Sequence, residues 1–243
     1  MKVYHEEMLV RTCNCDFRGA WRPGAILEMM QEVSGMHSHL LGCGRDVLLQ
    51  KGMVWVLTRL EVQMNRYPVV GERISVETFP TPTRRWFFPR YFIMRDEKGE
   101  NIGMASSLWV LLDINTRKML PPGELERIIP DNSDVAPPMG IPATVAKIQG
   151  EERLLRRMPA YTEIDVNGHV NNTKYVDWLC DSLGIEVMGE HCLSSFCVNY
   201  DAEILPGEEI EMHLVRSGVD CCLTGSNGDK RCFEIGVRLR SRG

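Results

Sequence analysis

Two segments of the chain place apolar side chains at helical spacing. Residues 25–41 and 170–183 each repeat such side chains every three or four positions, which is typical of a helix with one buried face. The repeating positions are Ile26, Met30, Val33 and His37 in the first segment, and Tyr175, Trp178, Leu179 and Ser182 in the second. Pro23 suits the first turn of the first helix, and Asn171 or Asn172 suits the N-cap of the second.

Each predicted helix is followed by segments of strand type with turn residues between them. After the first helix they are 53–64, 73–79, 85–94 and 103–113, and after the second they are 194–203, 209–215, 220–224 and 231–240. Phe196, Val198 and Tyr200 alternate with more polar residues, which is the period of a strand with two different faces. One helix followed by several antiparallel strands, occurring twice, predicts an α+β fold with a curved sheet around each helix.

A proline-rich segment separates the two similar halves. Residues 121–150 hold six of the 13 prolines of the chain, and proline is excluded from helix interiors and central strands. The sequence therefore predicts an N-terminal unit over residues 1–120, a linker over 121–150 and a C-terminal unit over 151–243.

Composition and charge argue against several classes of protein, including nucleic-acid-binding and membrane-inserted proteins. The 243 residues are 44% hydrophobic with a net charge of −5, and no basic run is long enough to bind nucleic acid. No stretch of about 18 apolar residues is present, so we expect no membrane insertion. The acidic N-terminal residues do not resemble a signal peptide, and a cytoplasmic protein is expected. The nine cysteines form no C-x-x-C pair, so we expect neither a metal nor a cofactor.

The densest group of reactive side chains lies just before the second predicted helix. Asp165, Asn167 and His169 occupy alternate positions, and in an extended segment their side chains share one face. The helix start beside them favours developing negative charge. A base, an amide donor and such a helix end suit ester or thioester hydrolysis, whereas an ordinary Asn-Gly turn is the competing interpretation.

The two halves differ at this point. When Gly19 is aligned with Gly168, Asp16 matches Asp165, but Arg18 and Ala20 take the places of Asn167 and His169. A turn that required asparagine and histidine would carry them in both halves. The comparison therefore favours an active second unit and a first unit with a different role.

The residues 165–175, DVNGHVNNTKY, are followed by Asp177-Trp178. This motif resembles that of the acyl-acyl-carrier-protein thioesterases of plants and bacteria. The resemblance extends over essentially the whole chain and includes Thr83-Arg84-Arg85 and the segment 109–113. It implies a tandem hotdog fold, a degenerate acyl-binding first unit, and a catalytic second unit that hydrolyses fatty acyl groups from acyl carrier protein in fatty acid biosynthesis.

The same resemblance implies the site. It assigns catalysis to Asp165, Asn167 and His169 on the motif, and to Glu203, the acidic residue 34 positions after the histidine. Plant relatives commonly carry cysteine directly after that glutamate, but here Ile204 offers no nucleophile, so water activated by Glu203 or Asp165 is expected. His169 would position the water, and Asn167 with N–H groups near residues 170–172 would hold the oxyanion.

Substrate and carrier binding also have candidate residues. The acyl chain needs an apolar slot, for which the first helix offers Met29, Met30, Val33 and Met36, although the same stripe fits an ordinary core. Carrier protein is acidic, so a net-negative chain needs local basic residues to bind it. The candidates are Arg84, Arg85, Arg90, Arg153, Arg156 and Arg157.

Other functions remain open at this stage. They are an acyl-CoA thioesterase, a hotdog hydratase or dehydratase acting on acyl thioesters, and a non-catalytic acyl-binding module. Because the chain carries its own pair of units, both a monomer and a homodimer of the doubled chain are compatible with the sequence.

Overall fold

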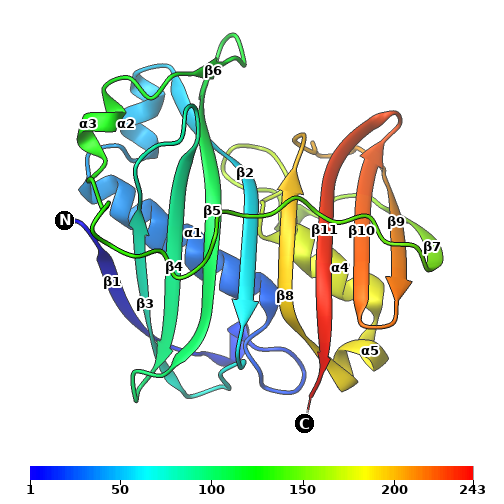
Figure 1. Cartoon of the computed structure of the whole chain (residues 1–243). Helices are drawn as coiled ribbons and strands as arrows, with labels where there is room; N and C mark the ends of the chain where they lie inside the picture. The colour runs from blue at the N-terminus through cyan, green and yellow to red at the C-terminus, as the bar shows by residue number, and fades with distance from the viewer. Residues whose placement is uncertain (243) are drawn as a thin grey trace. The chain divides into compact units, whose positions relative to one another are not determined.

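The computed structural model describes residues 1–242, which form two compact units (Figure 1). Unit 1 is Met1–Pro142 and unit 2 begins at Ala143. The proline-rich segment is divided between them. Its first part contributes to unit 1 a short helix, α3 (Leu125–Ile128), which lies between Pro122 and Pro130.

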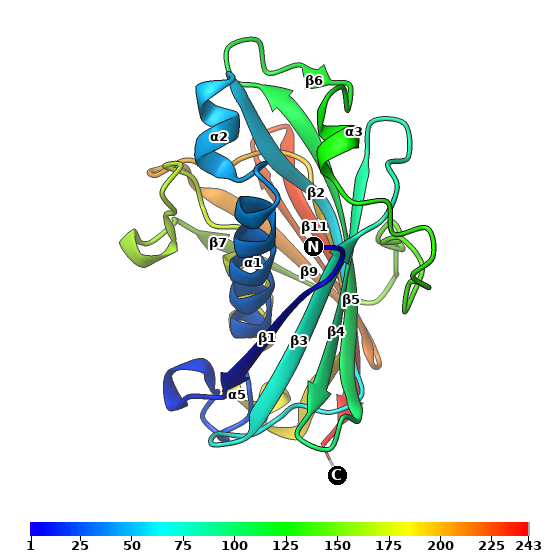
Figure 2. The same ribbon diagram turned by 90° about the vertical axis from the view of Figure 1, so that its left-hand side faces the viewer.

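Unit 1 is a long helix with a curved antiparallel sheet (Figure 2). The helices are α1 (Pro23–Leu40) and α2 (Arg45–Gln50), and a 3-10 turn covers Thr12–Asn14. The strands are β1 (Tyr4–Leu9), β2 (Met53–Met64), β3 (Arg73–Pro80), β4 (Phe88–Asp96), β5 (Asn101–Asp113) and β6 (Met119–Leu120). Their order within the unit is β1-β3-β4-β5-β2, with β6 paired to β5.

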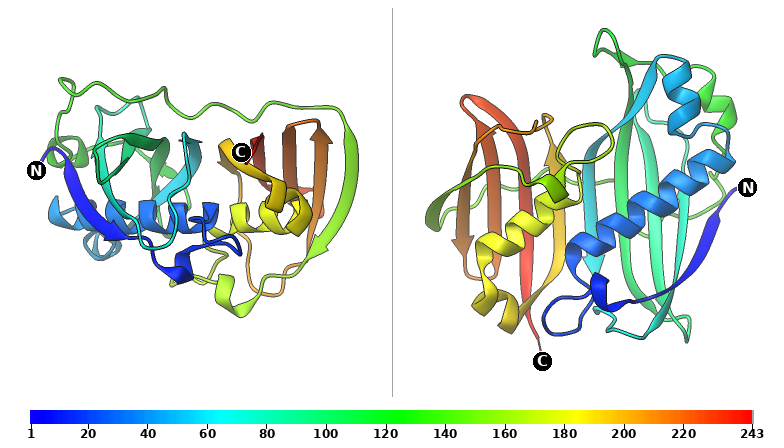
Figure 3. Two further views of the ribbon diagram at one scale, coloured as in Figure 1. Left: turned by 90° about the horizontal axis from the view of Figure 1, so that it is seen from below. Right: turned by 180° about the vertical axis from the view of Figure 1, so that it is seen from behind.

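Unit 2 repeats this plan with a shorter first helix (Figure 3). The helices are α4 (Lys174–Leu183) and α5 (Ile185–Glu190), and a 3-10 turn covers Tyr161–Glu163. The strands are β7 (Glu151–Arg157), β8 (His191–Tyr200), β9 (Ile210–Ser217), β10 (Asp220–Asn227) and β11 (Lys230–Ser241). Their order within the unit is β8-β11-β10-β9-β7, and each strand is antiparallel to its neighbours in this order.

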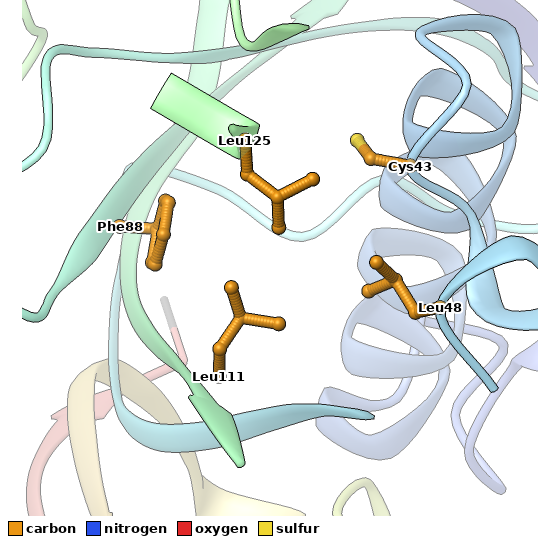
Figure 4. Packing of buried hydrophobic residues seen from close by; sticks show 5 residues of the cluster. All are labelled: Cys43, Leu48, Phe88, Leu111 and Leu125. Carbon is orange, nitrogen blue, oxygen red and sulfur yellow. The ribbon is translucent and has the colours of Figure 1, made fainter. Parts of the chain in front are cut away.

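The apolar stripe of α1 forms part of the core of unit 1. Ile26, Met30 and Val33 are buried, as the helical spacing predicts, and Pro23 lies in the first turn. Beyond the end of α1, a second cluster joins α2 and α3 to the sheet (Figure 4). Its buried members are Cys43, Leu48, Phe88, Leu111 and Leu125. Leu125 therefore anchors the proline-rich segment by burying an apolar side chain.

Aromatic side chains fill the core of unit 2. The Tyr175 ring lies 4.8 Å from the Phe233 ring and 5.5 Å from the Trp178 ring, measured between centroids. Both contacts have tilted or edge-to-face geometry, which is favourable for aromatic pairs. The apolar face of α4 is thereby fixed on β11.

The strand predictions agree with the structure except at the edges. All eight predicted segments are strands, with ends shifted by a few residues. The two edge strands, β1 and β7, were not predicted, because their mostly exposed residues carry little alternation of apolar and polar side chains.

The predicted start of the second helix was wrong. α4 begins at Lys174 with Thr173 as its N-cap, and not with Asn171 or Asn172. The backbone N–H of Val170 donates to Ile204 O at 2.9 Å, and that of Asn171 donates to Glu163 O at 2.8 Å. These residues are therefore tied to neighbouring segments, and the helix starts only after them.

Candidate active site

The motif residues 165–169 form a tight turn before α4. Asp165 N donates to His169 O at 2.8 Å, and Gly168 N donates to Asp165 O at 3.0 Å. Gly168 has a φ of 80°, a left-handed conformation in which a side chain would be strained. The expectation of an extended segment was wrong, because these bonds reverse the chain.

The Asp165 carboxylate holds this turn together. Its Oδ1 accepts from the backbone N–H of Asn167 at 2.8 Å and of His169 at 3.4 Å. Its Oδ2 accepts from Asn167 Nδ2 at 3.3 Å, which orients the Asn167 amide. Such bonds from an aspartate to its own backbone two residues on are the usual reason for aspartate in turns.

Unit 1 contains the same turn with different side chains. Asp16 Oδ1 accepts from the backbone N–H of Arg18 at 2.9 Å and of Ala20 at 3.0 Å, and Gly19 has a φ of 77°. Asp16 N also donates to Ala20 O at 2.8 Å. Because both units use the aspartate in the same bonds, the turn requires it, whereas neither asparagine nor histidine is needed to form the turn.

Glu203 lies beside His169 although 34 positions separate them in the sequence. His169 Nε2 is 3.5 Å from Glu203 Oε2, and the two side chains are 26% and 37% exposed. The bond from Val170 N to Ile204 O holds the Glu203 loop against the turn. The pair is therefore reachable from solvent yet fixed by the backbone on both sides.

The Glu203 loop also has a counterpart in unit 1. Leu205 N donates to Glu208 Oε2 at 2.8 Å, and Val69 N donates to Glu72 Oε1 at 2.9 Å. Pro68 O accepts from Trp21 N as Ile204 O accepts from Val170 N. This correspondence places Tyr67 where unit 2 has Glu203. Three of the four candidate side chains are thus replaced in unit 1, and only the aspartate that builds the turn is kept.

Two buried tyrosines lie close to the candidate site. Tyr200 Oη donates to Asn172 O at 2.9 Å, and the Tyr175 and Tyr200 rings are 5.5 Å apart. Burial raises the pKa of both phenols above their ordinary value. For Tyr175 the charges of Cys232, Asp165 and Glu203 raise the pKa further. Both tyrosines therefore remain neutral and act as packing and hydrogen-bonding groups.

Glu163, which the sequence analysis did not single out, is a further carboxylate close to the turn. Its backbone O accepts from the N–H of Asn171, just after the turn. Glu163 accepts from Trp178 Nε1 at 2.8 Å and from Ala160 N at 2.7 Å, and it pairs closely with Arg157. Arg157 also lies over the Trp178 ring at 5.0 Å. Burial raises the pKa of Glu163, but these hydrogen bonds and the Arg157 charge outweigh it, and the net shift is downward.

We expect Glu163→Ala to lower the free energy of unfolding by about 2–4 kcal/mol at neutral pH, because Arg157 loses a largely buried partner. The folded pKa of Glu163 is lowered, so its stabilising contribution is present above the ordinary glutamate pKa. That contribution is lost as the pH falls through the lowered value. Urea unfolding at neutral and acidic pH measures both effects.

The exposed Glu186 offers a matched control for this measurement. Glu186→Ala is expected to change stability by no more than about 0.5 kcal/mol. An equal loss for the two variants, or a loss for Glu163→Ala that grows in acid, would contradict the assignment.

The candidate acyl-binding residues of α1 divide into two groups. Met29, Met30 and Val33 are buried, with 5%, 4% and 2% of their surfaces exposed. Met36 does not share this burial, since 49% of its surface is exposed. Its position on the helix turns it away from the buried stripe.

Arg90 was wrong as a carrier-docking residue, because its side chain is buried. Its Nη1 donates to His37 Nδ1 at 3.1 Å and to Thr78 Oγ1 at 3.2 Å. Burial, followed by the Arg90 charge, lowers the pKa of His37 to about 4, so His37 is a neutral acceptor at physiological pH. The two side chains form a polar layer beside the apolar stripe of α1.

The other candidate docking residues differ in exposure and in their charged neighbours. Arg84, Arg85, Arg153 and Arg156 are exposed. Arg156 lies near Glu209 and Glu211, at 3.6 and 3.4 Å. Arg157 is directed to Glu163 and Asp181, which makes it a structural residue rather than a docking one.

Thr173 is a further polar residue near the turn that the sequence did not indicate. It is 3% exposed, and its hydroxyl oxygen has no hydrogen-bond partner within residues 1–242. It is also the N-cap of α4, where a hydroxyl usually bonds to the helix backbone.

In residues 1–242 no group of three or more histidine, cysteine, aspartate or glutamate side chains has the arrangement of a metal site. Across the same residues, no helix combines the length and the apolar character needed to span a bilayer.

A helix packed on a curved antiparallel sheet, present twice in one chain, defines a tandem hotdog protein. Residues 1–123 match the acyl-ACP thioesterase N-terminal domain, and residues 147–235 match the C-terminal domain of the same family. The chain belongs to the acyl-ACP thioesterase family.

Individual relatives agree with this assignment. A chloroplastic palmitoyl-acyl carrier protein thioesterase of Arabidopsis thaliana is 26% identical over 228 residues, which cover 88% of this chain and 55% of the plant protein. The chain thus spans about half the length of the curated relatives it matches.

Solved structures also match nearly the whole chain. An acyl-ACP thioesterase from Bacteroides thetaiotaomicron is 25% identical with a TM-score of 0.87, and the match covers 98% of each chain. The 12:0-ACP thioesterase from Umbellularia californica has the same fold, with a TM-score of 0.85 at 21% identity, over 99% of this chain and 98% of the other.

Proposed function

We propose that this protein hydrolyses fatty acyl-acyl-carrier-protein thioesters to free fatty acid and carrier protein. One observation carries the proposal: the His169–Glu203 pair, 3.5 Å apart, adjoins the turn that presents Asn167, and unit 1 has the same turn without these three side chains. Family membership and the names of the relatives supply the substrate class.

In the proposed reaction, Glu203 accepts a proton from a water molecule that His169 positions. The water oxygen attacks the thioester carbonyl carbon, and the carbonyl oxygen takes the negative charge. Asn167 Nδ2 donates to that oxygen, which is the usual role of a fixed amide in acyl transfer. The carbon–sulfur bond then breaks, and the leaving thiolate takes the proton back through the His169–Glu203 pair.

Between the two carboxylates, we assign the base to Glu203 and a positioning role to Asp165. Both oxygens of Asp165 already accept hydrogen bonds within the turn. Unit 1 keeps the aspartate although its turn has no histidine, so the aspartate is explained without catalysis. Glu203 has no such equivalent, because tyrosine takes its place.

We assign the acyl tail to unit 1, along α1. Met29, Met30 and Val33 provide a buried apolar stripe, and each buried methylene contributes about 0.8 kcal/mol. The polar layer of His37 and Arg90 beside this stripe offers no apolar surface to a longer chain. Chain-length preference then depends on residues far in sequence from the reacting groups.

For carrier docking we propose the tight turn formed by residues 84–87. Arg84 N donates to Phe87 O at 2.8 Å, and Phe87 N donates to Arg84 O at 3.0 Å. Thr83 Oγ1 donates to Glu126 Oε1 at 2.7 Å and fixes the base of the turn. Arg84 and Arg85 are exposed at its tip, together with Trp86, so the turn presents charge and apolar surface to an acidic partner.

Replacing both Arg84 and Arg85 with glutamate is expected to raise KM for acyl-carrier-protein about tenfold, because the attraction to an acidic partner becomes repulsion. KM for an uncharged acyl-pantetheine thioester serves as the control and should change little, since that substrate carries neither protein nor phosphate. Equal KM changes for the two substrates, or a parent KM for acyl-carrier-protein that salt does not alter, would remove this surface from the proposal.

The function itself is tested by following thiol release and free fatty acid from a mixture of acyl-carrier-proteins. The proposal expects turnover with accumulation of free fatty acid, and a higher kcat/KM than with the matching acyl-CoA. A preference for acyl-CoA would indicate the closest alternative. Addition or loss of water at a double bond without thiol release would indicate a hydratase or dehydratase, and tight binding without turnover would indicate a binding module.

A further inference from the structure

The edge strand β7 carries an unusual order of charges. It reads Glu151-Glu152-Arg153-Leu154-Leu155-Arg156-Arg157, so acidic residues begin the strand and basic residues end it. Among the described residues, β7 pairs only with β9 and closes the strand order of unit 2. An edge strand presents unpaired backbone N–H and C=O groups that another strand can bind.

The exposed side chains of β7 are not those of a protected edge. Leu154, at the centre of the strand, is 52% exposed, and Glu152, Arg153 and Arg156 are exposed around it. Edge strands that avoid pairing usually carry charged side chains, especially lysine, or proline where a partner strand would pack. Here the centre is apolar and the charges flank it with opposite signs.

We propose that β7 pairs with β7 of a second copy of this chain, antiparallel about a two-fold axis at Leu154. In that register Glu152 lies opposite Arg156 of the copy, and Glu151 lies opposite Arg157. The two-fold axis repeats each pair, so four unlike charge pairs and a Leu154–Leu154 contact cross the interface. Met158, which is 60% exposed, then lies opposite Gly150, where no side chain competes for space.

Neighbouring registers do not offer this complementarity. In an antiparallel pair, directly opposed side chains point to the same face of the sheet. A shifted register must therefore again place residues of the same face opposite one another. A centre at Arg153 places that arginine opposite its own copy. A centre at Leu155 places Arg153 opposite Arg157. Only the Leu154 register brings unlike charges together at every charged pair that flanks the centre.

Glu152 and Arg156 also have partners on β9 of the same chain. Glu152 Oε1 is 2.8 Å from His213 Nδ1, and Arg156 is 3.4 Å from Glu211. The proposed pairs with the second copy would add to these contacts on the exposed face of the strand. Arg157 is directed inward to Glu163, so its pair with Glu151 contributes less.

The other edge strand behaves differently. β1 of unit 1 carries the exposed Glu6 and Glu7 at its centre. An antiparallel copy centred on either residue would place a glutamate opposite itself, which is destabilising. The chain thus protects one sheet edge against self-pairing and leaves the other self-complementary.

Sedimentation of the whole chain over a range of concentrations tests the proposal. The parent protein is expected to form a dimer. Arg156→Glu and Glu152→Arg each place like charges opposite one another and should raise the dimer dissociation constant about tenfold or more. The double variant, in which the two charges are exchanged, should restore the dimer, which a general loss of folding would not allow.

A cysteine at the two-fold axis provides an independent measurement. Leu154→Cys should form a disulfide-linked dimer on mild oxidation, with the parent chain and its nine cysteines as the matched control. A parent chain that stays monomeric would overturn the proposal. So would a dimer that Arg156→Glu leaves intact, or one that Leu154→Cys does not cross-link beyond the parent level.

Discussion

Glu203→Gln is expected to lower kcat about a thousandfold, because general-base catalysis typically contributes 10²–10⁴-fold. Glutamine keeps the size of the side chain and its place beside His169 but accepts no proton from water at neutral pH. The Glu203 side chain is 37% exposed, so the substitution removes no buried charge and the fold is expected to persist. Single-turnover hydrolysis of an acyl-carrier-protein, with unfolding measured in parallel, separates the two effects.

The two turns provide a matched comparison for the other carboxylate. Asp165→Ala and Asp16→Ala remove the same backbone bonds in unit 2 and unit 1. Both should cost similar stability, but only Asp165→Ala should lower turnover, because Asn167 and His169 lose their positions. If Glu203→Gln retained nearly full activity while Asp165→Ala abolished it at unchanged stability, the base would have to be reassigned to Asp165.

Asn167→Ala is expected to lower kcat by about 10²–10³-fold, the usual cost of one oxyanion donor. The side chain is oriented by Asp165 Oδ2 at 3.3 Å, so its amide is held before the substrate arrives. The backbone bonds of the turn do not involve the Asn167 side chain, and Gly168 keeps its conformation. KM should therefore change much less than kcat.

Arg18→Ala supplies the control for this variant, since Arg18 occupies the equivalent position in unit 1. It should leave hydrolysis within about twofold of the parent, as expected for a surface position outside the reacting groups. Should Asn167→Ala keep the parent kcat, the amide would have no part in stabilising the oxyanion.

The sequence predicted the local elements well where one face is buried. The stripe of Ile26, Met30 and Val33 predicted α1 almost to its ends, and the strands that lie inside each sheet were all found. It missed β1 and β7, because an edge strand with exposed side chains lacks the alternation that marks a strand. It also started α4 four residues early, since the bonds of Val170 and Asn171 to distant segments are invisible in a local pattern.

Only part of the candidate site was predicted, because contacts between distant segments do not appear in a local sequence pattern. Asp165, Asn167 and His169 are neighbours in sequence, so a local motif indicates them. Glu203 followed only from the family resemblance, and Glu163 was missed, because its partners Arg157 and Trp178 are contacts of the folded chain. Arg90 was misplaced because residue type alone does not say which side of an element is buried.

The sequence by itself determined the doubled α+β plan, the position of Asp165, Asn167 and His169 just before the second helix, and the absence of Asn167 and His169 equivalents from unit 1. These properties depend on short-range spacing and on residue chemistry. The tertiary structure alone decided that Glu203 lies 3.5 Å from His169, that Arg90 is buried, and that β7 is an edge. Each of these depends on which distant segments pack together, and that packing is set by the burial of the whole core.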